Sequence, residues 1–311
     1  MGTTYTVKIA EPVPPDAAAS LKIRIDEVLG RINGSMSTYD PGSELSIFNR
    51  SGAQQWIEVS NDLFEVLSIA ATVHGDSGGA FDVTVGPLVN LWGFGPHDAA
   101  PGPPSPEQLK QASAFVGFDH LSLRLTPPSI MKAHRDVYID LSAIAKGYAV
   151  DRLAALIERN GLEHFMVEIG GEIKLSGRNP GGTGWRIALE RPDGDRIVPD
   201  EVLTLSDMAL ATSGNYRNFR EIEGQRYGHT LDPRTGAPVT HRLAAVTVLH
   251  EDAVWADAYA TALMVLGPES GPDLASNLGI AARFVLRDGG RTVICETPAY
   301  ARIARGDSGG F

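Results

Sequence analysis

Residues 140–151, with the sequence DLSAIAKGYAVD, limit the possible fold more than any other segment of this 311-residue chain. They follow a short apolar run at 137–139 and lead into a stretch rich in alanine and leucine that stops at Gly161. This order predicts a strand, a tight turn and a helix, with Ser142 as a candidate N-cap and Gly161 as the C-terminal glycine.

A junction of this kind can bind charged groups through its backbone. The first N–H groups of a helix have no intrahelical partner and attract anions, while the carbonyl groups of the preceding turn remain available to a cation. Asp140 adds a carboxylate at the start of the turn, and Lys146 adds a positive charge one turn into the helix. The alternative is an ordinary connection with a capping Asp and a solvated Lys, and the motif by itself favours this alternative.

The charge balance restricts the partners of the chain. A formal net charge of −11 and a pI near 5.2 argue against direct binding to nucleic acid or to an anionic membrane surface, because both require a basic patch. An anionic cofactor would therefore need a metal ion or local cations. The single cysteine, Cys295, excludes an internal disulfide and a thiolate metal cluster, and its apolar neighbours predict a core position.

Hydrophobic periodicity predicts both helices and strands along the chain. Residues 95–106 are dense in proline and glycine, which predicts a surface loop or a connection between lobes. Helices are expected at 21–34, 60–75, 107–115 and 251–267, and strands at 3–9, at 243–249, twice within 121–139, and on both sides of the glycine pair in 164–177.

Two residues in the first third of the chain are candidates for ligand contacts. Tyr39 lies among small hydroxyl residues, where a planar aromatic ligand could stack, although an ordinary polar loop explains the segment equally simply. Asp82 is flanked by aliphatic and aromatic residues, where a bare carboxylate is costly without a partner. A ligand, a helix cap or a hydrogen-bonded turn could supply that partner.

Polar residues also flank turns in the second half of the chain. Glu168 and Glu172 lie on either side of a glycine pair, and they are either exposed edge charges, the commoner case, or residues that line a cleft. His229 and Thr230 fall at the end of a predicted strand, before a turn. A lone histidine is usually structural, but ligand contacts gather at such strand ends.

Asp257 and Thr261 are four residues apart in a predicted helix and therefore lie on one face. A carboxylate and a hydroxyl give two hard oxygen ligands, which suit Mg²⁺ or Ca²⁺ and are poor for Zn²⁺. The spacing is common and is weak evidence alone. The sequence contains neither a phosphate-binding G-x-x-x-x-G-K-[ST] loop nor a strand-opening G-x-G-x-x-G, so a dinucleotide would bind by a non-Rossmann route.

Taken together, these segments resemble the ApbE-type FAD:protein FMN transferases. The motifs that carry the resemblance follow the order of that family and cover nearly the whole chain: MGTTYTVKI, MSTYDPGSELSIFN, GGAFDVTVGPLVNLWGFGP, DLSAIAKGYAVD, EIGGEIKLSG, ATSGNYRNF, HTLDPRTG and ADAYATAL. The resemblance implies a single domain over residues 1–311 with two lobes. It implies an α+β fold with mixed or antiparallel sheets, flanking helices and a T-fold-like architecture, and FAD in the cleft between the lobes.

The resemblance also implies an activity, namely Mg²⁺-dependent transfer of FMN from FAD to a Ser or Thr hydroxyl of a target protein through a phosphoester bond, with release of AMP. Alternatives are Mg²⁺-dependent hydrolysis of FAD to FMN and AMP, or flavin binding without turnover. The expected acceptor is a subunit of a membrane redox complex, and no nucleic acid is expected as a partner. The expected location is periplasmic, as a membrane-anchored lipoprotein whose leader is absent from this sequence, and the alternative is cytoplasmic.

Site residues follow from matching this sequence to the motifs of that family. The Mg²⁺ ligands are expected to be the main-chain carbonyl of Ala143 and the side chains of Asp257 and Thr261. Because the reaction that the resemblance implies is phosphoryl transfer, positioning and charge neutralisation are the expected roles of Lys146 and Asp257, and His229 is the candidate base for the acceptor hydroxyl. The expected FAD contacts are Met1, Tyr39, Ala80, Phe81, Asp82, Asp140, Lys146 and Thr230.

Overall fold

A computed structural model describes residues 2–96, 102–193, 196–214, 219–222, 225–288 and 291–306. The chain divides into two compact units. Unit 1 comprises Met1, Gly30–Ala145 and Arg217–Thr240, and unit 2 comprises Gly2–Leu29, Lys146–Tyr216 and His241–Phe311. Each unit is described separately below.

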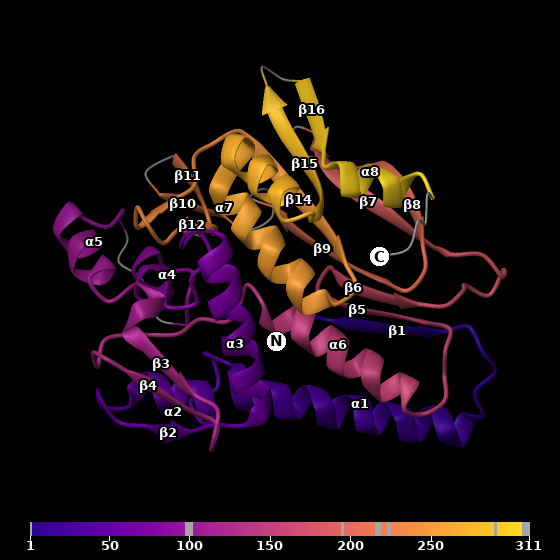
Figure 1. Ribbon diagram of the computed structural model, residues 1–311, viewed down its shortest axis with the longest axis horizontal. Coiled ribbons are helices and arrows are strands. Elements are labelled where there is room, and N and C mark those ends of the chain that lie inside the picture. Colours follow the sequence, from indigo (N-terminus) through magenta and orange to yellow (C-terminus); the bar gives the residue numbers. More distant parts are fainter. Residues whose placement is uncertain are drawn as a thin grey trace. The chain divides into compact units, whose positions relative to one another are not determined.

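Unit 2 is built on a seven-stranded antiparallel sheet in the order β1-β5-β6-β9-β14-β15-β16 (Figure 1). Its strands are β1 (Tyr5–Ile9), β5 (Phe165–Ile169), β6 (Glu172–Ser176), β9 (Met208–Gly214), β14 (Leu243–His250), β15 (Ala281–Asp288) and β16 (Arg291–Glu296). A separate hairpin pairs β7 (Trp185–Asp193) with β8 (Arg196–Leu205). The predicted strand pair around residues 170 and 171 is confirmed, and both glycines have positive φ in the turn between β5 and β6.

Helices cover the sheet of unit 2. Helix α7 (Ala253–Asn277) packs along β14, β9 and β15, and α8 (Pro298–Ala304) packs on β15 (Figure 1). Helix α6 (Ala145–Glu158) ends before Gly161, which has a φ of 76° and donates its N–H to Glu158, as predicted. The predicted helix end at Gly267 is confirmed, because the backbone is non-helical there, with φ 80° and ψ −170°, and Pro268, which suits the first turn of a helix, begins a second helical segment within α7.

Unit 1 combines short helices with small sheets. Its helices are α2 (Glu44–Arg50), α3 (Asn61–Asp76), α4 (Gly86–Trp92), α5 (Pro106–Ser113) and the short 3₁₀ helix η1 (Phe118–His120). One sheet has the order β2-β4-β3, from β2 (Ile57–Glu58), β4 (Ser129–Lys132) and β3 (Leu121–Arg124). Two further hairpins pair β10 (Phe219–Ile222) with β11 (Gln225–Gly228), and β12 (Leu231–Asp232) with β13 (Ala237–Pro238).

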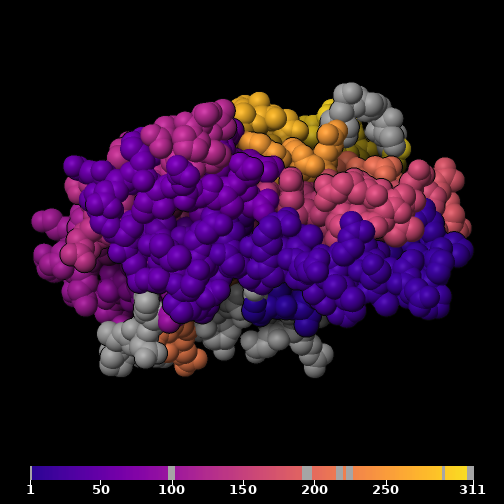
Figure 2. Space-filling model, turned by 90° about the horizontal axis from the view of Figure 1, so that it is seen from below, coloured from indigo at the N-terminus to yellow at the C-terminus, as the bar shows by residue number. Residues whose placement is uncertain are grey.

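The long helix α1 (Pro15–Met36) and helix α3 confirm the periodicity of the sequence. In α1, the residues Leu21, Ile25 and Val28 are buried, and the residues between them are exposed. The indigo N-terminal part of the chain, to which α1 belongs, forms one stretch of the surface in Figure 2. Helix α3 begins where its sequence predicts, because the Ser60 side chain accepts the N–H of Leu63.

The α+β fold class, with an antiparallel sheet and flanking helices, is confirmed, but three local predictions need correction. Residues 137–139 form no strand beyond an isolated bridge at Tyr138. Ser142 is not an N-cap, since α6 begins at Ala145. Cys295 is exposed, because it lies on the edge strand β16.

Parts of two predictions fall outside the described chain. Of the proline- and glycine-rich loop predicted at 95–106, residues 97–101 are outside the described residues, and the others before Pro106 form no helix or strand. Met1 is also outside them. Among the helices that are described, none has both the length and the apolar character needed to cross a bilayer.

Candidate functional site

The first turn of α6 meets the first turns of α7 within unit 2. The N–H of Gly147, which belongs to the group of helix-start donors without an intrahelical partner, donates a 3.0 Å hydrogen bond to Oδ2 of Asp257. A glycine is required at this crossing, because a Cβ on Gly147 would lie 2.3 Å from the carbonyl oxygen of Ala253. The Asp257 side chain is thereby fixed in the interior, where the residue is only 4% exposed.

Lys146 places its ammonium group between two buried carboxylates. Its Nζ atom lies 2.5 Å from Oε1 of Glu172 and 4.0 Å from Oδ1 of Asp257. Burial by itself would lower the pKa of Lys146, but the attraction of Asp257 and Glu172 is stronger and raises it above its ordinary value. The lysine predicted to be either a ligand contact or a solvated charge is therefore a partly exposed cation, with 29% of its side chain accessible, that is paired with buried carboxylates of unit 2.

The two carboxylates beside Lys146 are held in an environment that disfavours negative charge. Burial, and then repulsion from Asp257, raise the pKa of Glu172 to about 8, although Lys146 opposes the shift. Burial also raises the pKa of Asp257, against the opposing effects of Lys146 and the Gly147 N–H. An additional positive charge placed beside these carboxylates would stabilise their ionised forms.

Thr261 lies one turn beyond Asp257 on α7, as the spacing predicts. Its Oγ1 atom is 3.0 Å from Oγ of Ser213, the penultimate residue of β9. Ser213 was not predicted as a site residue. The sequence signal for it is the run of small and hydroxyl residues at 211–214, which forms the end of β9.

The two glutamates that flank the glycine turn have different environments. Glu172 is 3% exposed and pairs with Lys146, as described above. Glu168 is half-buried, and its Oε1 accepts the N–H of Gly171 at 2.8 Å. The interpretation of Glu172 as an exposed edge charge is therefore wrong.

Asp140 and Ala143 belong to the turn in unit 1 that precedes α6. Asp140 is buried, its N–H donates to the carbonyl of Val83 at 2.8 Å, and its Oδ1 accepts the N–H of Ser142 at 2.8 Å. Asp140 thus caps the turn, which is the structural alternative for this motif. Ala143 is half-buried within the turn.

Ala80, Phe81 and Asp82 form a buried segment after α3 in unit 1. Asp82 Oδ1 accepts the N–H and the hydroxyl of Thr84, at 2.8 and 2.6 Å, and Oδ2 lies 3.3 Å from Nδ1 of His74. This hydrogen bond with Asp82 is the main reason why the pKa of His74 is raised. The partner expected for this carboxylate is therefore present within the protein, as a hydrogen-bonded turn and a histidine.

The remaining predicted flavin contacts also lie in unit 1. Tyr39 is 68% exposed, with its hydroxyl 3.5 Å from the carbonyl of Phe94. Thr230 is buried directly before β12, and its carbonyl accepts the N–H of Val239 at 3.0 Å. His229 is half-buried and precedes it. The predicted residues therefore fall into two groups, with Lys146, Asp257 and Thr261 in unit 2 and the others in unit 1.

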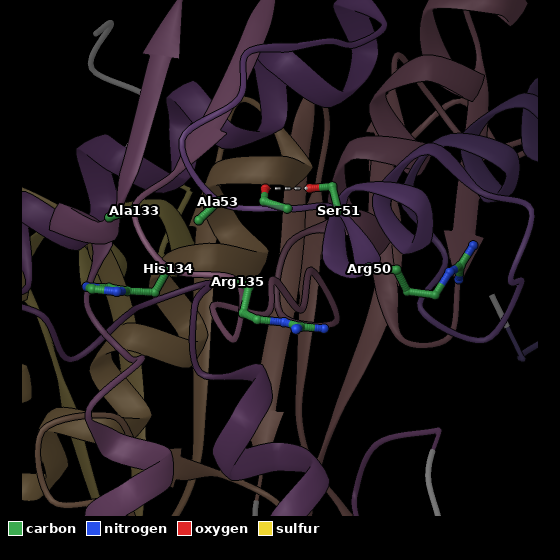
Figure 3. Close-up of a pocket in the computed structure, with 7 residues that line it drawn as sticks. Arg50, Ser51, Ala53, Ala133, His134 and Arg135 are labelled. Carbon is green, nitrogen blue, oxygen red and sulfur yellow. Dashed lines mark hydrogen bonds between the residues drawn. The ribbon is translucent and has the colours of Figure 1, made fainter.

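A pocket of about 500 Å³ in unit 1 contains none of the predicted site residues (Figure 3). Three basic residues contribute to its lining, Arg50, His134 and Arg135. Their charges do not converge, because the side chains of His134 and Arg135 extend in opposite directions and Arg50 donates to the carbonyl of Pro41.

The described chain contains no group of three His, Cys, Asp or Glu side chains that could hold a metal ion. A metal ion at the unit 2 cluster would therefore need hydroxyl or main-chain oxygen ligands beside its carboxylates. The set implied by the family resemblance, a carboxylate, a hydroxyl and a carbonyl, is of this mixed kind and stays a prediction.

Comparisons with known proteins find similarity to one family along nearly the whole chain. The ApbE family profile matches residues 1–284. The chain is 43% identical to the FAD:protein FMN transferase of Vibrio cholerae serotype O1 over 287 residues, covering 92% of this chain and 85% of that protein. It is 40% identical to the protein of the same name from Haemophilus influenzae over 309 residues, covering 97% and 89%.

Solved structures of flavin transferases are also similar to this chain. The flavin transferase ApbE from Vibrio cholerae has a TM-score of 0.91 at 39% identity, with 97% of this chain and 96% of that chain covered. The apo form of the Pseudomonas stutzeri flavinyl transferase ApbE has a TM-score of 0.87 at 40% identity, with 98% and 94% covered. The resemblance seen in the motifs is confirmed, and this chain belongs to the ApbE family.

Proposed function

We propose that this protein is an Mg²⁺-dependent FAD:protein FMN transferase, which moves the FMN half of FAD to a Ser or Thr hydroxyl of an acceptor protein and releases AMP. The observation that carries the proposal is the buried cluster of Lys146 and Asp257, with Thr261 one turn further along α7. Similarity to enzymes named FAD:protein FMN transferase supports the assignment of flavin chemistry to this cluster.

The donor set fits magnesium. The side chains of Asp257 and Thr261 offer only hard oxygen atoms, and these two residues, with the carbonyl of Ala143, would hold the ion. Bound Mg²⁺ would neutralise charge on the phosphate oxygens of the flavin nucleotide. Gly147 keeps the Asp257 carboxylate in one orientation, and Ser213 does the same for the Thr261 hydroxyl.

Lys146 supplies a fixed positive charge for the diphosphate of FAD. Such a charge is needed in a protein with a net charge of −11, which repels an anionic nucleotide over most of its surface. The neighbouring carboxylates keep Lys146 protonated. In this role the side chain stabilises negative charge that moves toward the AMP leaving group.

The acceptor hydroxyl must lose its proton while its oxygen attacks the FMN phosphorus. We assign that proton to an imidazole nitrogen of His229, as general base. The new bond joins the acceptor oxygen to the FMN phosphorus, and the bond that breaks joins this phosphorus to the oxygen that leaves with AMP. Tyr39, which is 68% exposed, is proposed to stack its ring on a ring of FAD.

The remaining parts of the proposal rest on the family resemblance. They are a periplasmic location, an acceptor in a membrane redox complex, and flavin contacts from Met1, from the segment 80–82, and from Asp140 and Thr230. Asp140 and Asp82 are partnered within unit 1, so their contribution is proposed to be the placement of the backbone around them.

The deciding experiment incubates the protein with FAD, Mg²⁺ and a peptide that carries an accessible Thr, followed by mass spectrometry. The expected product is a peptide with covalently attached FMN, together with one AMP per adduct. Free FMN and AMP without an adduct would instead identify an FAD hydrolase. Intact FAD after prolonged incubation would identify a flavin-binding protein without turnover.

A further inference from the structure

Glu172 is a buried residue of the unit 2 cluster to which the proposed function gives no direct role. It is the first residue of β6 and is 3% exposed. One carboxylate oxygen, Oε1, pairs with Lys146 at 2.5 Å. The other, Oε2, is fully buried and has no hydrogen-bond partner among the described residues. A buried carboxylate oxygen without a partner is costly, which points to a ligand that completes its coordination.

The position of Lys146 indicates the kind of ligand. Its ammonium group contacts Glu172 and approaches Asp257 to 4.0 Å, so one cation faces both carboxylates. Oxygen Oε2 of Glu172 is left without a partner, because the one ammonium faces Oε1 and Asp257. A positive ligand would complete this cluster, and the unpartnered oxygen of Glu172 suits a hard cation rather than a second ammonium.

We propose that Oε2 of Glu172 is an additional ligand of the divalent cation held by Asp257 and Thr261. We further propose that the ammonium of Lys146 competes with this cation while no FAD is bound. The diphosphate of FAD then offers Lys146 a second anionic partner, so nucleotide and divalent cation should bind cooperatively. This inference rests on the proposed function, and the experiment below separates the two.

The simpler alternative is that Glu172 serves only as the counterion of Lys146. The two interpretations make different predictions for substitutions of Lys146 and Glu172, and the Glu172→Gln variant, alone and combined with Lys146→Met, separates them. If Glu172 is only a counterion, Lys146→Met leaves an unpaired buried charge, and Glu172→Gln leaves the affinity for a divalent cation unchanged. If Glu172 is a ligand, removal of the competing ammonium must strengthen cation binding through Glu172.

The experiment measures Mn²⁺ affinity by electron paramagnetic resonance of the unbound ion, first without FAD and then with FAD present. We expect Glu172→Gln to weaken Mn²⁺ binding by about tenfold. This is the lower end of the loss in metal affinity that follows when residues around a bound metal ion are replaced. Lys146→Met is expected to tighten Mn²⁺ binding, and the double variant Lys146→Met/Glu172→Gln to lose that gain. FAD is expected to tighten Mn²⁺ binding more in the wild type than in Lys146→Met.

Glu168→Gln is the matched control. It changes the other glutamate of the same turn, whose carboxylate accepts the Gly171 N–H rather than facing Lys146, and it is expected to leave Mn²⁺ affinity unchanged. Far-ultraviolet circular dichroism of each variant checks that it is folded.

Two different failures can be told apart. Unchanged Mn²⁺ affinity in folded Glu172→Gln, with binding abolished in Asp257→Ala, would overturn the role of Glu172 and leave the proposed function intact. No Mn²⁺ binding by the wild type with or without FAD would overturn the metal-dependent function itself.

Discussion

The backbone N–H of Gly147 donates to the carboxylate of Asp257, and this 3.0 Å bond joins the start of α6 to the second turn of α7. The contact needs close approach of the two helices, which only a residue without a side chain permits. The orientation of the Asp257 carboxylate, the proposed metal ligand, thus depends on a glycine that has no side chain of its own.

Gly147→Ala is expected to destabilise the protein and to displace Asp257. The new Cβ would lie 2.3 Å from the carbonyl oxygen of Ala253 and 2.8 Å from the Asp257 Cβ, so the start of α7 must move. Overpacking of this kind costs about 2 kcal/mol of unfolding free energy. Urea denaturation measures the loss. The control is Gly30→Ala in α1, where nothing lies within 4 Å of the new Cβ and a gain of about 0.5–1 kcal/mol is expected. Equal stability of both variants would contradict the close contact.

Asp151→Ala is expected to loosen α7. Its two carboxylate oxygens accept the N–H groups of Ala253 and Val254, at 3.0 and 2.9 Å, and Oδ1 also lies 3.2 Å from Nζ of Lys174. Removing the buried Asp151 carboxylate is expected to lower the free energy of unfolding by about 3 kcal/mol, because both helix N–H groups and the Lys174 ammonium then lack this partner. Chemical denaturation measures the loss.

The control for Asp151 is its neighbour in space, Asp252. This residue occupies the N-cap position of α7 without a side-chain capping bond, and its side chain is 52% exposed where it meets Lys174. Asp252→Ala is therefore expected to cost less than about 1 kcal/mol. A larger loss in Asp252→Ala than in Asp151→Ala would mean that α7 is capped by its own residue.

Sequence patterns predicted the parts of this fold that depend on neighbouring residues. Helices α1 and α3 follow from apolar spacing, the turn at residues 170 and 171 from its glycines, and Asp257 with Thr261 from helical periodicity. Each of these signals lies within a few residues of the structure that it specifies.

The wrong predictions concern residues whose environment is set by partners that are distant in the sequence. Residues 137–139 resemble a strand, but Ile139 exchanges hydrogen bonds with the side chain of Asn49 instead of pairing with a neighbouring strand. Cys295 has apolar neighbours and still lies on an edge strand. Glu172 is buried because Lys146, far away in the chain, faces it from α6. Periodicity cannot identify such partners, since it records only which side chains share a face.

The His74–Asp82 pair is expected to make stability depend on pH. Its hydrogen bond to Asp82 raises the pKa of His74 above the ordinary 6.5, so the protonated ring stabilises the folded state. This stabilisation is complete below the ordinary pKa and is lost as the pH rises through the folded-state pKa. The stability difference between wild type and His74→Gln should therefore shrink from about pH 5.5 to about pH 8. Urea denaturation at both values tests this, and a difference that grows with pH would contradict the pairing.

Asp257→Ala is expected to abolish Mg²⁺-dependent release of AMP while FAD binding is weakened rather than lost. The carboxylate is the charged member of the set formed by Ala143, Asp257 and Thr261, but the nucleotide keeps its other contacts. Chromatographic assay of AMP and fluorescence titration of FAD measure the two effects separately. EDTA should reproduce the loss of turnover in the wild type, and turnover that persists in EDTA would exclude a metal-dependent reaction.

His229→Ala is expected to slow FMN transfer to an acceptor peptide by about 10²–10⁴-fold, the usual contribution of a general base. Binding of FAD should stay close to the wild-type value, because the assigned role concerns the acceptor hydroxyl and not the nucleotide. The transfer rate of the wild type should also fall at low pH, as the imidazole becomes protonated, and His229→Ala should lose this dependence. Thr230→Ser, which keeps the neighbouring hydroxyl, is the control for local disturbance. A wild-type transfer rate in His229→Ala with FAD bound would assign the proton to another group.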